Sequence, residues 1–401
     1  MVTGLFPGPF LMNEVCELCR HQSLGAVYQP ERSTRGLKVY LCSHCGLVQS
    51  LPRVDRAPRA AAAVSGGADW GNLRYGKGFR TQAALAALKR HADLTADLTL
   101  LDVGSNRGSF ARAFLAAAPN ASIVAVEPDE RVAGSCAALE RCEIVQSRIE
   151  DTAIESGRFD IVHSCHTIEH LADPARILAD HWRTLKPGGL LVLDAPNIAI
   201  IGAEDIVEEW FIDKHLYHFS ARTLMRMVAA AGFEIVVAPD IEDRENLLIV
   251  ARKAYTGFPA TDPDPREVAE AERLLTAYGT NRACNLSALT YVAAAISGMA
   301  PKRVAMWGAG RLFDTLVVHG QFAPTTLSLL IDAHLRAHVE DRHGCKLTGP
   351  EALASANPDV VIVMSRGFAG EIATEARRLV PRAQILFYAD LLADARLSQA
   401  A

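Results

Sequence analysis

The stretch LDVGSNRG at residues 101–108 ends one expected strand and begins one expected helix. Gly104 can adopt the backbone of a tight turn and let a ligand approach the main chain, and Gly108 lets the helix pack close to the strand. The spacing is GxxxG and differs from the GxGxxG of pyrophosphate-binding turns. Glu127, at the end of the next expected strand, can accept hydrogen bonds from both hydroxyls of a ribose. Together these residues indicate a nucleoside-binding edge of an α/β sheet.

Strand and helix signals alternate on both sides of this turn. We expect strands at 98–103, 122–127, 143–146, 159–165 and 189–194, with helices at 107–118 and 175–185. Strands separated by helices imply parallel βαβ units with both sheet faces covered. Two more strands, 233–238 and 247–251, are joined by a short acidic connection and are expected to form an antiparallel pair at the sheet edge. The pattern assigns residues 75–254 to one doubly wound α/β domain.

Two later phrases make the assignment more specific. They read RFDIVHSCHTIEHL at residues 158–171 and LKPGGLLVL at residues 185–193. With the glycine turn and Glu127, this ordered set resembles the class I S-adenosylmethionine-dependent methyltransferases over nearly all of residues 98–252. The resemblance implies a Rossmann-like seven-stranded sheet and S-adenosyl-L-methionine as the cofactor. The alternative is an α/β domain that binds another nucleotide or none.

The resemblance also assigns cofactor-binding residues. It implies binding by Asp102, Gly104, Asn106, Gly108, Glu127, Ile149, Glu150, Cys165 and His166. The last two of these match positions that face the methyl-bearing sulfur. Arg148 stands where the family has an acid that contacts the adenine amino group, so Glu150 or Asp151 is expected to take that role.

Four cysteines in the first 56 residues form two CxxC pairs, Cys16 with Cys19 and Cys42 with Cys45. Each pair can place two thiolates on one side of a tetrahedron, so we expect a four-thiolate structural zinc site. The bound metal would supply the free energy to fold a module too small for its own core. Four ordinary thiols are the alternative. A linker is expected at 57–74.

Residues 255–401 repeat the α/β alternation after a boundary rich in proline, glycine and aspartate. A long helical region is expected at 266–299, and strands at 303–307, 327–332, 360–364 and 384–388. The first of these strands leads into a GAG turn at 308–310, and Asp332 follows at the spacing of a ribose acid. A Rossmann-like packing module without a ligand is an equally weighted alternative.

The order of the three modules resembles the sugar C-methyltransferases, which methylate a carbon of a nucleotide-linked keto sugar. That resemblance implies that Gly308, Gly310 and Arg311 lie near the phosphates of a small-molecule nucleotide-sugar. It also implies a base-assisted enolate attack on the sulfonium methyl. A base and correct positioning suffice for this reaction, because sulfonium is an excellent leaving group.

The catalytic stretch of that family matches FIDKHLYHFS at residues 211–220. We expect His215 to be the general base, assisted by Asp213. Ile212 and Lys214 depart from the tyrosine and glutamate of the family, which keeps two alternatives open: O- or N-methylation of a sugar or small metabolite, and a non-catalytic nucleotide-sugar-binding protein.

Several other residues are candidates either for binding the acceptor or for a purely structural role. Tyr75, Tyr217 and His218 are candidates for the acceptor pocket. Ser220 is expected to cap the following helix, a role that many unrelated class I enzymes share. Glu169 and His170, at the head of a helix, are interpreted as capping and packing residues rather than catalysts.

Composition limits the partners. The 401-residue chain is 50% hydrophobic and 22% charged with a net charge of −5, and no basic stripe is present, so nucleic acid is a poor candidate, including for a zinc-knuckle RNA methyltransferase. No segment has the length or flanks of a signal peptide or membrane span, which predicts a cytoplasmic protein. The nine cysteines suggest one metal site and buried thiols. The oligomeric state is left open.

Overall fold

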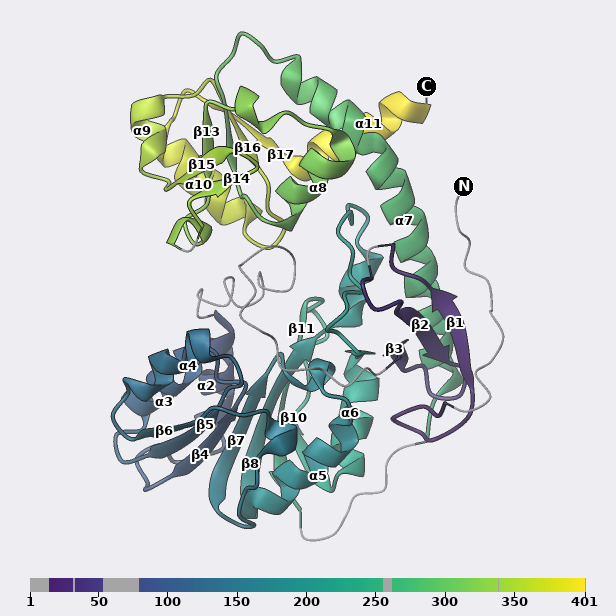
Figure 1. The fold of residues 1–401 in the computed structure, drawn as a ribbon, viewed down its shortest axis with the longest axis vertical. Coiled ribbons are helices and arrows are strands. Elements are labelled where there is room, and N and C mark those ends of the chain that lie inside the picture. Colours follow the sequence, from purple (N-terminus) through teal and green to yellow (C-terminus); the bar gives the residue numbers. More distant parts are fainter. Residues whose placement is uncertain (1–13, 32, 53–78, 255–261, 338, 401) are drawn as a thin grey trace.

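The computed structural model describes residues 14–31, 33–52, 79–254, 262–337 and 339–400, and these residues form three sheets (Figure 1). The expected linker at 57–74 and Tyr75 lie outside the described residues. The N-terminal sheet has the order β1-β2-β3-β9. Its strands are β1 (Leu24–Tyr28), β2 (Lys38–Cys42), β3 (Val48–Leu51) and β9 (Tyr217–His218).

Strand β9 comes from the middle of the chain and completes the N-terminal sheet. It pairs antiparallel with β3, with Val48 opposite His218 and Gln49 opposite Tyr217. The backbone N–H of Ser50 also donates to the carbonyl of Leu216 at 2.8 Å. The N-terminal module is therefore joined by backbone hydrogen bonds to the segment that carries His215.

The central sheet has seven strands in the order β10-β11-β8-β7-β4-β5-β6. Their bounds are β4 (Thr99–Val103), β5 (Ser122–Val126), β6 (Cys142–Val145), β7 (Phe159–Cys165), β8 (Leu185–Pro196), β10 (Phe233–Val237) and β11 (Asn246–Lys253). Strands β4 to β8 pair in parallel, whereas β11 pairs antiparallel with both β8 and β10. The predicted α/β fold class, with a seven-stranded sheet and an antiparallel edge pair, is confirmed.

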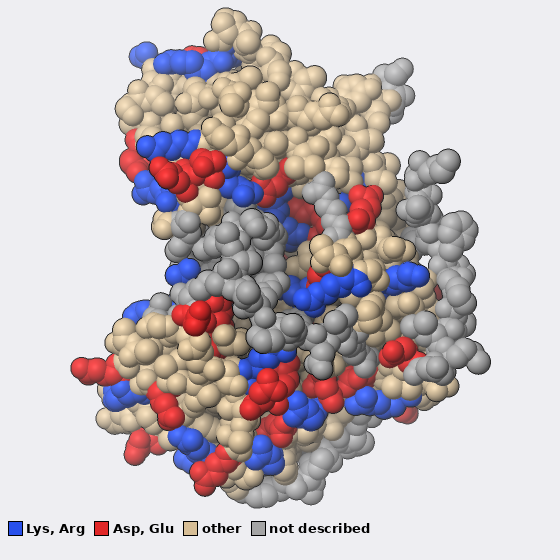
Figure 2. All heavy atoms as spheres, in the orientation of Figure 1, with Lys and Arg blue, Asp and Glu red and all other residues tan. Residues whose placement is uncertain are grey.

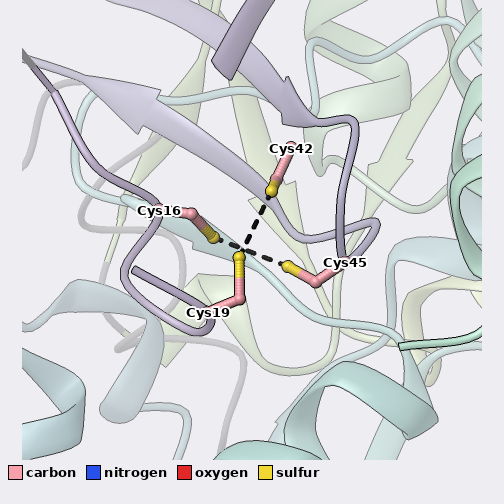
Figure 3. A group of neighbouring side chains, drawn as sticks. All are labelled: Cys16, Cys19, Cys42 and Cys45. Atoms are coloured by element: carbon pink, nitrogen blue, oxygen red, sulfur yellow. Dashed lines mark hydrogen bonds between the residues drawn. The ribbon is translucent and has the colours of Figure 1, made fainter. Parts of the chain in front are cut away.

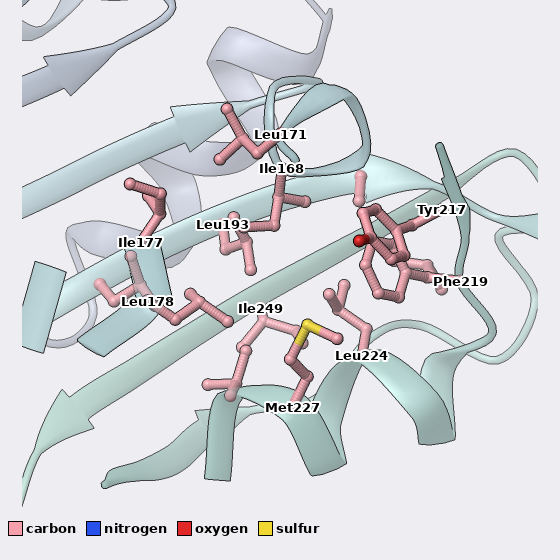
Figure 4. Close-up of a cluster of buried hydrophobic side chains, with 14 of the residues drawn as sticks. Ile168, Leu171, Ile177, Leu178, Leu193, Tyr217, Phe219, Leu224, Met227 and Ile249 are labelled. Atoms are coloured by element: carbon pink, nitrogen blue, oxygen red, sulfur yellow. The ribbon is translucent and has the colours of Figure 1, made fainter. Parts of the chain in front are cut away.

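Helices cover both faces of this sheet because successive residues of a buried strand point to opposite sides. Leu100 packs with α2 (Phe79–Leu88) and α3 (Ser109–Ala117), on the side where α4 (Glu130–Ala137) also lies. Leu101 packs in the opposite cluster with α5 (Pro174–Thr184) and α6 (Ala221–Ala230), part of which Figure 4 shows. The parallel strands then share one carboxyl edge, where a doubly wound fold binds its ligand.

Local signals explain where the helices begin. Helix α5 starts with Pro174, and the side chain of Asp173 accepts from the N–H of Arg176. Helix α6 starts at a capping box between Ser220 and Thr223, which confirms the predicted cap. Three short helices interrupt the loops of this domain: η2 (Ile149–Asp151), η3 (Ile168–His170) and η4 (Ile198–Gly202).

The long helix α7 (Pro265–Ser297) runs from the N-terminal sheet to the C-terminal unit (Figure 1) and contributes to two hydrophobic cores. Its first half contributes Leu274 and Tyr278 to a cluster that also contains Val39 of β2. Its second half contributes Leu289 and Val292 to the core of the C-terminal unit. The helix therefore packs against the N-terminal and central regions at one end and the C-terminal region at the other.

The C-terminal unit is a six-stranded sheet in the order β14-β15-β13-β12-β16-β17, parallel except for β14. Its strands are β12 (Val304–Trp307), β13 (Leu329–Ile331), β14 (Asp341–Arg342), β15 (Cys345–Thr348), β16 (Val360–Val363) and β17 (Gln384–Phe387). Its helices are α8 (Arg311–Gly320), η5 (Pro324–Thr326), η6 (Leu335–Ala337), α9 (Ala352–Ala356), α10 (Ala369–Leu379) and α11 (Tyr388–Ala400). Among the described residues, no helix has the length and apolar character needed to cross a membrane.

Candidate functional site

The glycine turn after β4 has a backbone that only glycine adopts without strain. Gly104 has φ 71° and Gly108 has φ 70°. A Cβ on Gly104 would lie 2.2 Å from Oγ1 of Thr167, and one on Gly108 would lie 2.8 Å from Sγ of Cys136. The turn therefore brings its backbone into close contact with the loop after β7 and with α4.

Glu127 follows β5 at the same edge and is tied to the turn. Its Oε2 accepts from the N–H of Asn106 at 2.8 Å and its Oε1 from the N–H of Asp129 at 2.9 Å. Burial raises the pKa of Glu127, although these two hydrogen bonds counteract it. A carboxylate has about four acceptor positions, so two remain for ribose hydroxyls.

Asp102, the last acid of β4, is buried below the turn. Its Oδ1 pairs with Nδ1 of His163 at 2.7 Å, whereas its Oδ2 has no hydrogen-bonding partner in the described parts of the chain. On the far side of Glu127, η2 follows β6 with Ile149 buried and Glu150 partly exposed. The parallel strands thus bring these predicted cofactor residues to one edge.

The residues after β7 lie at the same edge. Sγ of Cys165 donates to Oδ2 of Asp194 at 3.6 Å, and Nε2 of His166 pairs with Oδ1 of Asn246 at 3.3 Å. Burial raises the pKa of the Cys165 thiol well above its usual value, and burial together with Arg80 and His170 lowers that of His166. Both groups are therefore neutral near pH 7.

His215, the predicted base, lies on the loop before β9 and is held against η3. The backbone N–H of Leu216 donates to the carbonyl of Glu169 at 2.8 Å, and the rings of His215 and His170 have centroids 4.8 Å apart. Burial lowers the pKa of His215 well below its ordinary value, and the neighbouring histidines add to this. His215 is consequently a neutral imidazole with a lone pair, the form that accepts a proton.

Asp213 has its hydrogen bonds to the N-terminal module. Its carboxylate accepts from Oγ of Ser33 at 2.6 Å and from the N–H and Oγ1 of Thr34 at 2.9 and 2.6 Å. Burial alone would raise the pKa of Asp213, but these donors outweigh it and lower the pKa. The structure thus gives Asp213 a positioning contact for the His215 loop.

Comparisons with known proteins identify the family of the central domain. A family model described as a methyltransferase domain matches residues 77–238. Residues 77–238 are a class I S-adenosylmethionine-dependent methyltransferase domain.

The relatives of this methyltransferase domain match it only in part. An uncharacterised methyltransferase of Mycolicibacterium vanbaalenii is 42% identical over 102 residues, which are 24% of this chain and 39% of that protein. A ubiquinone biosynthesis O-methyltransferase of Cereibacter sphaeroides is 42% identical over 65 residues, 14% of this chain and 26% of that protein. The chain therefore spans less than half the length of these relatives. An S-adenosylmethionine dependent methyltransferase structure from Mesorhizobium loti covers 42% of this chain and 97% of its own, with 16% identity and a TM-score of 0.35.

Glu169 and His170 lie beside His215, whereas the sequence pattern favoured capping and packing roles for them. Glu169 is 1% exposed, and neither of its carboxylate oxygens has a hydrogen-bonding partner among the residues that the structure describes. Nε2 of His170 lies 3.7 Å from Oε1 of Glu169. A carboxyl oxygen of Glu169 and one ring nitrogen each of His170 and His215 lie within 4.8 Å of one another. The carboxyl group and the two imidazoles therefore form one cluster at this edge of the sheet.

Two residues proposed for the acceptor pocket lie in the interior of the protein. The ring of Tyr217 is 1% exposed and packs among aliphatic side chains, as Figure 4 shows, and its hydroxyl donates to the carbonyl of Ala172 at 2.9 Å. Nε2 of His218 pairs with Oγ of Ser50 at 2.9 Å, and burial lowers the pKa of His218 to about 3. Both side chains join the N-terminal sheet to the methyltransferase domain.

The four predicted metal ligands converge in the N-terminal module (Figure 3). The Sγ atoms of Cys16 and Cys45 lie 3.5 Å apart, and those of Cys19 and Cys42 lie 3.6 Å apart. All four Sγ atoms lie within 4.8 Å of one another. Zinc–sulfur bonds of about 2.3 Å give tetrahedral sulfur separations of about 3.8 Å. The donor set therefore fits one zinc ion with four thiolates, a structural arrangement that leaves no position for water or substrate.

The C-terminal glycine turn is built like the first but has other neighbours. Gly308 has φ 118°, and a Cβ there would lie 2.4 Å from the carbonyl oxygen of Met364. The N–H of Ala309 donates to Oδ2 of Asp332 at 3.1 Å. Arg311, predicted to contact phosphates, donates instead to the carbonyl of Glu209.

An acidic segment before the His215 loop occupies this second edge. Arg366, just after β16, donates to Oδ2 of Asp205 at 2.6 Å and to Oε1 of Glu208 at 2.7 Å. Burial would raise the pKa of Glu208, but Arg366 outweighs it and lowers the pKa to about 2. Sequence reasoning missed this contact because Arg366 and the acidic segment lie in different parts of the chain.

Proposed function

We propose that the chain is an S-adenosylmethionine-dependent enzyme that methylates a carbon of a nucleotide-linked keto sugar, with His215 as the general base. The observation that carries the proposal is the neutral imidazole of His215 beside the cofactor edge, held against η3 by the Leu216 backbone. A base with a depressed pKa is unprotonated at neutral pH and ready to accept a proton.

The proposed cofactor residues lie along one edge of the central sheet. The turn at Gly104, the carboxylate of Glu127 and the unpartnered Oδ2 of Asp102 fit an adenosyl group with an amino-acid tail. Bound S-adenosylmethionine supplies an electrophilic methyl group. Neutral Cys165 and His166 line the edge near the sulfonium and add no charge that would repel it.

The chemistry then needs one proton transfer. His215 removes the proton from the carbon beside the ketone, and the electrons of that C–H bond delocalise onto the ketone oxygen. The carbon forms a bond to the methyl group as the carbon–sulfur bond breaks, and the sulfur keeps that electron pair. The proton stays on His215 and later passes to solvent, so atoms and charge balance.

The sugar assignment is supported by the order of the modules and by the four-cysteine site. Arg311 and Arg366 are paired with the acidic segment in this structure, so contact with phosphates would require these pairs to open. The face shown in Figure 2 has acidic and basic side chains interspersed without a continuous basic stripe, in keeping with a small-molecule acceptor rather than nucleic acid.

O- or N-methylation of a sugar or small metabolite is the second candidate. Ile212 and Lys214 favour it, because they replace the tyrosine and glutamate of the sugar C-methyltransferases. The same neutral His215 can deprotonate a hydroxyl. A non-catalytic role is less consistent with an intact glycine turn and Glu127.

Two measurements test the proposal. Calorimetric titration with S-adenosylmethionine and with S-adenosylhomocysteine should show binding, and absence of both would end the proposal. Labelled methyl donor is then incubated with nucleotide 4-keto sugars and with hydroxyl and amine acceptors. Washout of deuterium from the carbon beside the ketone supports C-methylation, whereas label on oxygen or nitrogen without washout supports the second candidate.

A further inference from the structure

Glu169 is a buried acid at the proposed cofactor edge, and its carboxyl oxygens have no hydrogen-bonding partner within the described residues. It lies in η3, directly after β7, with 1% of its surface exposed. A buried polar group left unpaired has lost its hydrogen bonds to water without gaining others, which destabilises the protein. Such a cost calls for an explanation, and at the edge of an enzyme fold the usual one is a ligand that completes the pairing.

Three imidazoles surround this carboxyl group. Nε2 of His170 lies 3.7 Å and Nδ1 of His166 lies 3.8 Å from Oε1, and a ring nitrogen of His215 lies within 4.8 Å of the carboxyl. The charges that act from farther away are those of Asp194, Arg80 and Lys214. Burial dominates and raises the pKa of Glu169 to about 8. Most of the Glu169 population is therefore a neutral acid with an O–H donor at pH 7.

The two nearest histidines have hydrogen-bonding partners of their own. Nδ1 of His170 donates to the carbonyl of Lys214 at 2.8 Å, and Nε2 of His166 pairs with Oδ1 of Asn246 at 3.3 Å. The ring nitrogens that face Glu169 lie 3.7 and 3.8 Å from Oε1, which is longer than a hydrogen bond. The carboxyl group therefore has no hydrogen bond to either ring.

We infer that Glu169 is a second catalytic residue, which donates a hydrogen bond from its neutral carboxyl group to the acceptor oxygen while His215 removes the neighbouring proton. The inference rests on the proposed function, because it concerns the same acceptor. Glu169 keeps its proton throughout: the C–H bond breaks toward His215, the ketone π electrons move onto oxygen, and that oxygen accepts from Glu169. Bound S-adenosylmethionine would supply the methyl group to this carbon, and its sulfur would keep the electron pair of the broken carbon–sulfur bond.

The geometry suits a donor and a base acting on adjacent atoms. An acid O–H and an imidazole nitrogen within 4.8 Å can reach the oxygen and the α-carbon of one keto group, with contacts of about 2.7–3.3 Å. A neutral carboxylic acid in an apolar site is a strong donor to a developing oxyanion. Preorganised donors of this kind contribute roughly 100- to 1000-fold to turnover.

Glu169 is more buried than the two histidines beside it. The side chain of His170 is 21% exposed and His215 is partly exposed, whereas Glu169 is 1% exposed. Contact between the acceptor oxygen and the carboxyl group therefore requires a side chain around Glu169 to move when the acceptor binds. This arrangement keeps water away from the acid and preserves its neutral form until the acceptor binds.

The test compares Glu169→Gln, which keeps an N–H donor, with Glu169→Ala, which removes it. We expect kcat to fall about 100- to 1000-fold in the alanine variant and less than about 10-fold in the glutamine variant. The Kd for S-adenosylmethionine should stay unchanged in both, which also shows that they fold. The wild-type kcat should decline above about pH 8 as the Glu169 carboxyl ionises, and Glu169→Gln should lose that decline.

An infrared titration tests the same inference without turnover. A carboxylic acid band should be present at pH 7, disappear above about pH 8 and be missing in Glu169→Gln. An ionised Glu169 at pH 7, equal losses in the two variants, or activity that requires an added divalent cation would overturn the inference. If the wild type binds no cofactor, the proposed function fails separately from the state of Glu169.

Discussion

The chain contains two glycine turns of the same construction with different surroundings. Each turn follows an inner strand of a doubly wound sheet and has a glycine with positive φ, Gly104 in the first and Gly308 in the second. In each, a backbone N–H donates to the acid that ends the next strand, Glu127 or Asp332. Local sequence and local geometry alone would therefore assign the same role to both.

The groups beyond each turn distinguish them. At the first edge, one carboxyl oxygen of Asp102, one of Asp194 and both of Glu169 are buried without a hydrogen-bonding partner in the part of the chain that the structure describes. At the second edge, Arg366 is paired with Asp205 and Glu208 of the methyltransferase domain. We infer that unpaired buried groups mark a ligand site, whereas paired charges mark a joint between domains. The glycine turn is compatible with a ligand site and with a joint between domains, so it does not distinguish the two.

The largest expected effect belongs to the base at the first edge. His215→Ala should lower kcat about 100- to 10,000-fold, because an unaided C–H or O–H proton is lost slowly. The Kd for S-adenosylmethionine, measured by calorimetry, should change little. His343→Ala, in the C-terminal unit, is the matched control and should keep wild-type kcat. Full turnover of His215→Ala would refute the base assignment.

The two strand-end acids provide a direct test of the comparison. Glu127→Ala should weaken the binding of S-adenosylmethionine about 100-fold, because two charge-assisted hydrogen bonds to the ribose are lost. Asp332→Ala removes the equivalent acid of the second turn and should leave this Kd unchanged. Calorimetric titration of both variants gives the result. Equal weakening would show that both edges hold the cofactor or that neither does.

Part of this comparison follows from the sequence. The glycine turn, Glu127 and the cap at Ser220 depend on residues close together in the chain, and period and turn chemistry predict them. The antiparallel pairing of Gln49 with Tyr217 depends on segments far apart, and strand β9 is only two residues long. A strand that short has no period to detect, so the fourth strand of the N-terminal sheet was not predicted.

The candidate site was predicted in part for the same reason. His215 was identified from its motif, but the burial of Glu169 results from packing of β7, η3 and the His215 loop together. No local pattern reports such burial. In the sequence, the only sign of a special role was that Glu169 and His170 follow the strand β7. Their position at the start of a helix favoured a capping role instead. For Arg311, the partner at Glu209 lies in another domain and has no sequence signature.

A smaller effect is expected at the joint on the second edge. Arg366→Ala leaves Asp205 and Glu208 partly buried without their cation, which should lower the free energy of unfolding by about 1–3 kcal/mol. Arg303→Ala, which breaks the exposed pair with Asp359, is the control and should cost about 0–1 kcal/mol. Thermal unfolding monitored by circular dichroism measures both. Equal costs in the two variants would mean that the joint contributes nothing specific.

The smallest expected effect is the pH dependence of this joint. Arg366 lowers the pKa of Glu208 to about 2 in the folded protein, below the value of about 4.3 in an unfolded chain. A depressed pKa stabilises the folded state above pH 4.3, and this contribution is lost as the pH falls from about 4.3 toward 2. It is at most about 3 kcal/mol, since one pKa unit corresponds to about 1.4 kcal/mol.

Denaturant unfolding between pH 5 and pH 2.5 should therefore show a steeper loss of stability in the wild type than in Glu208→Gln, which cannot ionise. Arg366→Ala should lose most of this slope, because the main cation that lowers the pKa of Glu208 is absent and Arg311 alone remains. If all three proteins lose stability in parallel, Glu208 is not paired in solution. The second edge would then be free to bind an anion, and its contrast with the first edge would disappear.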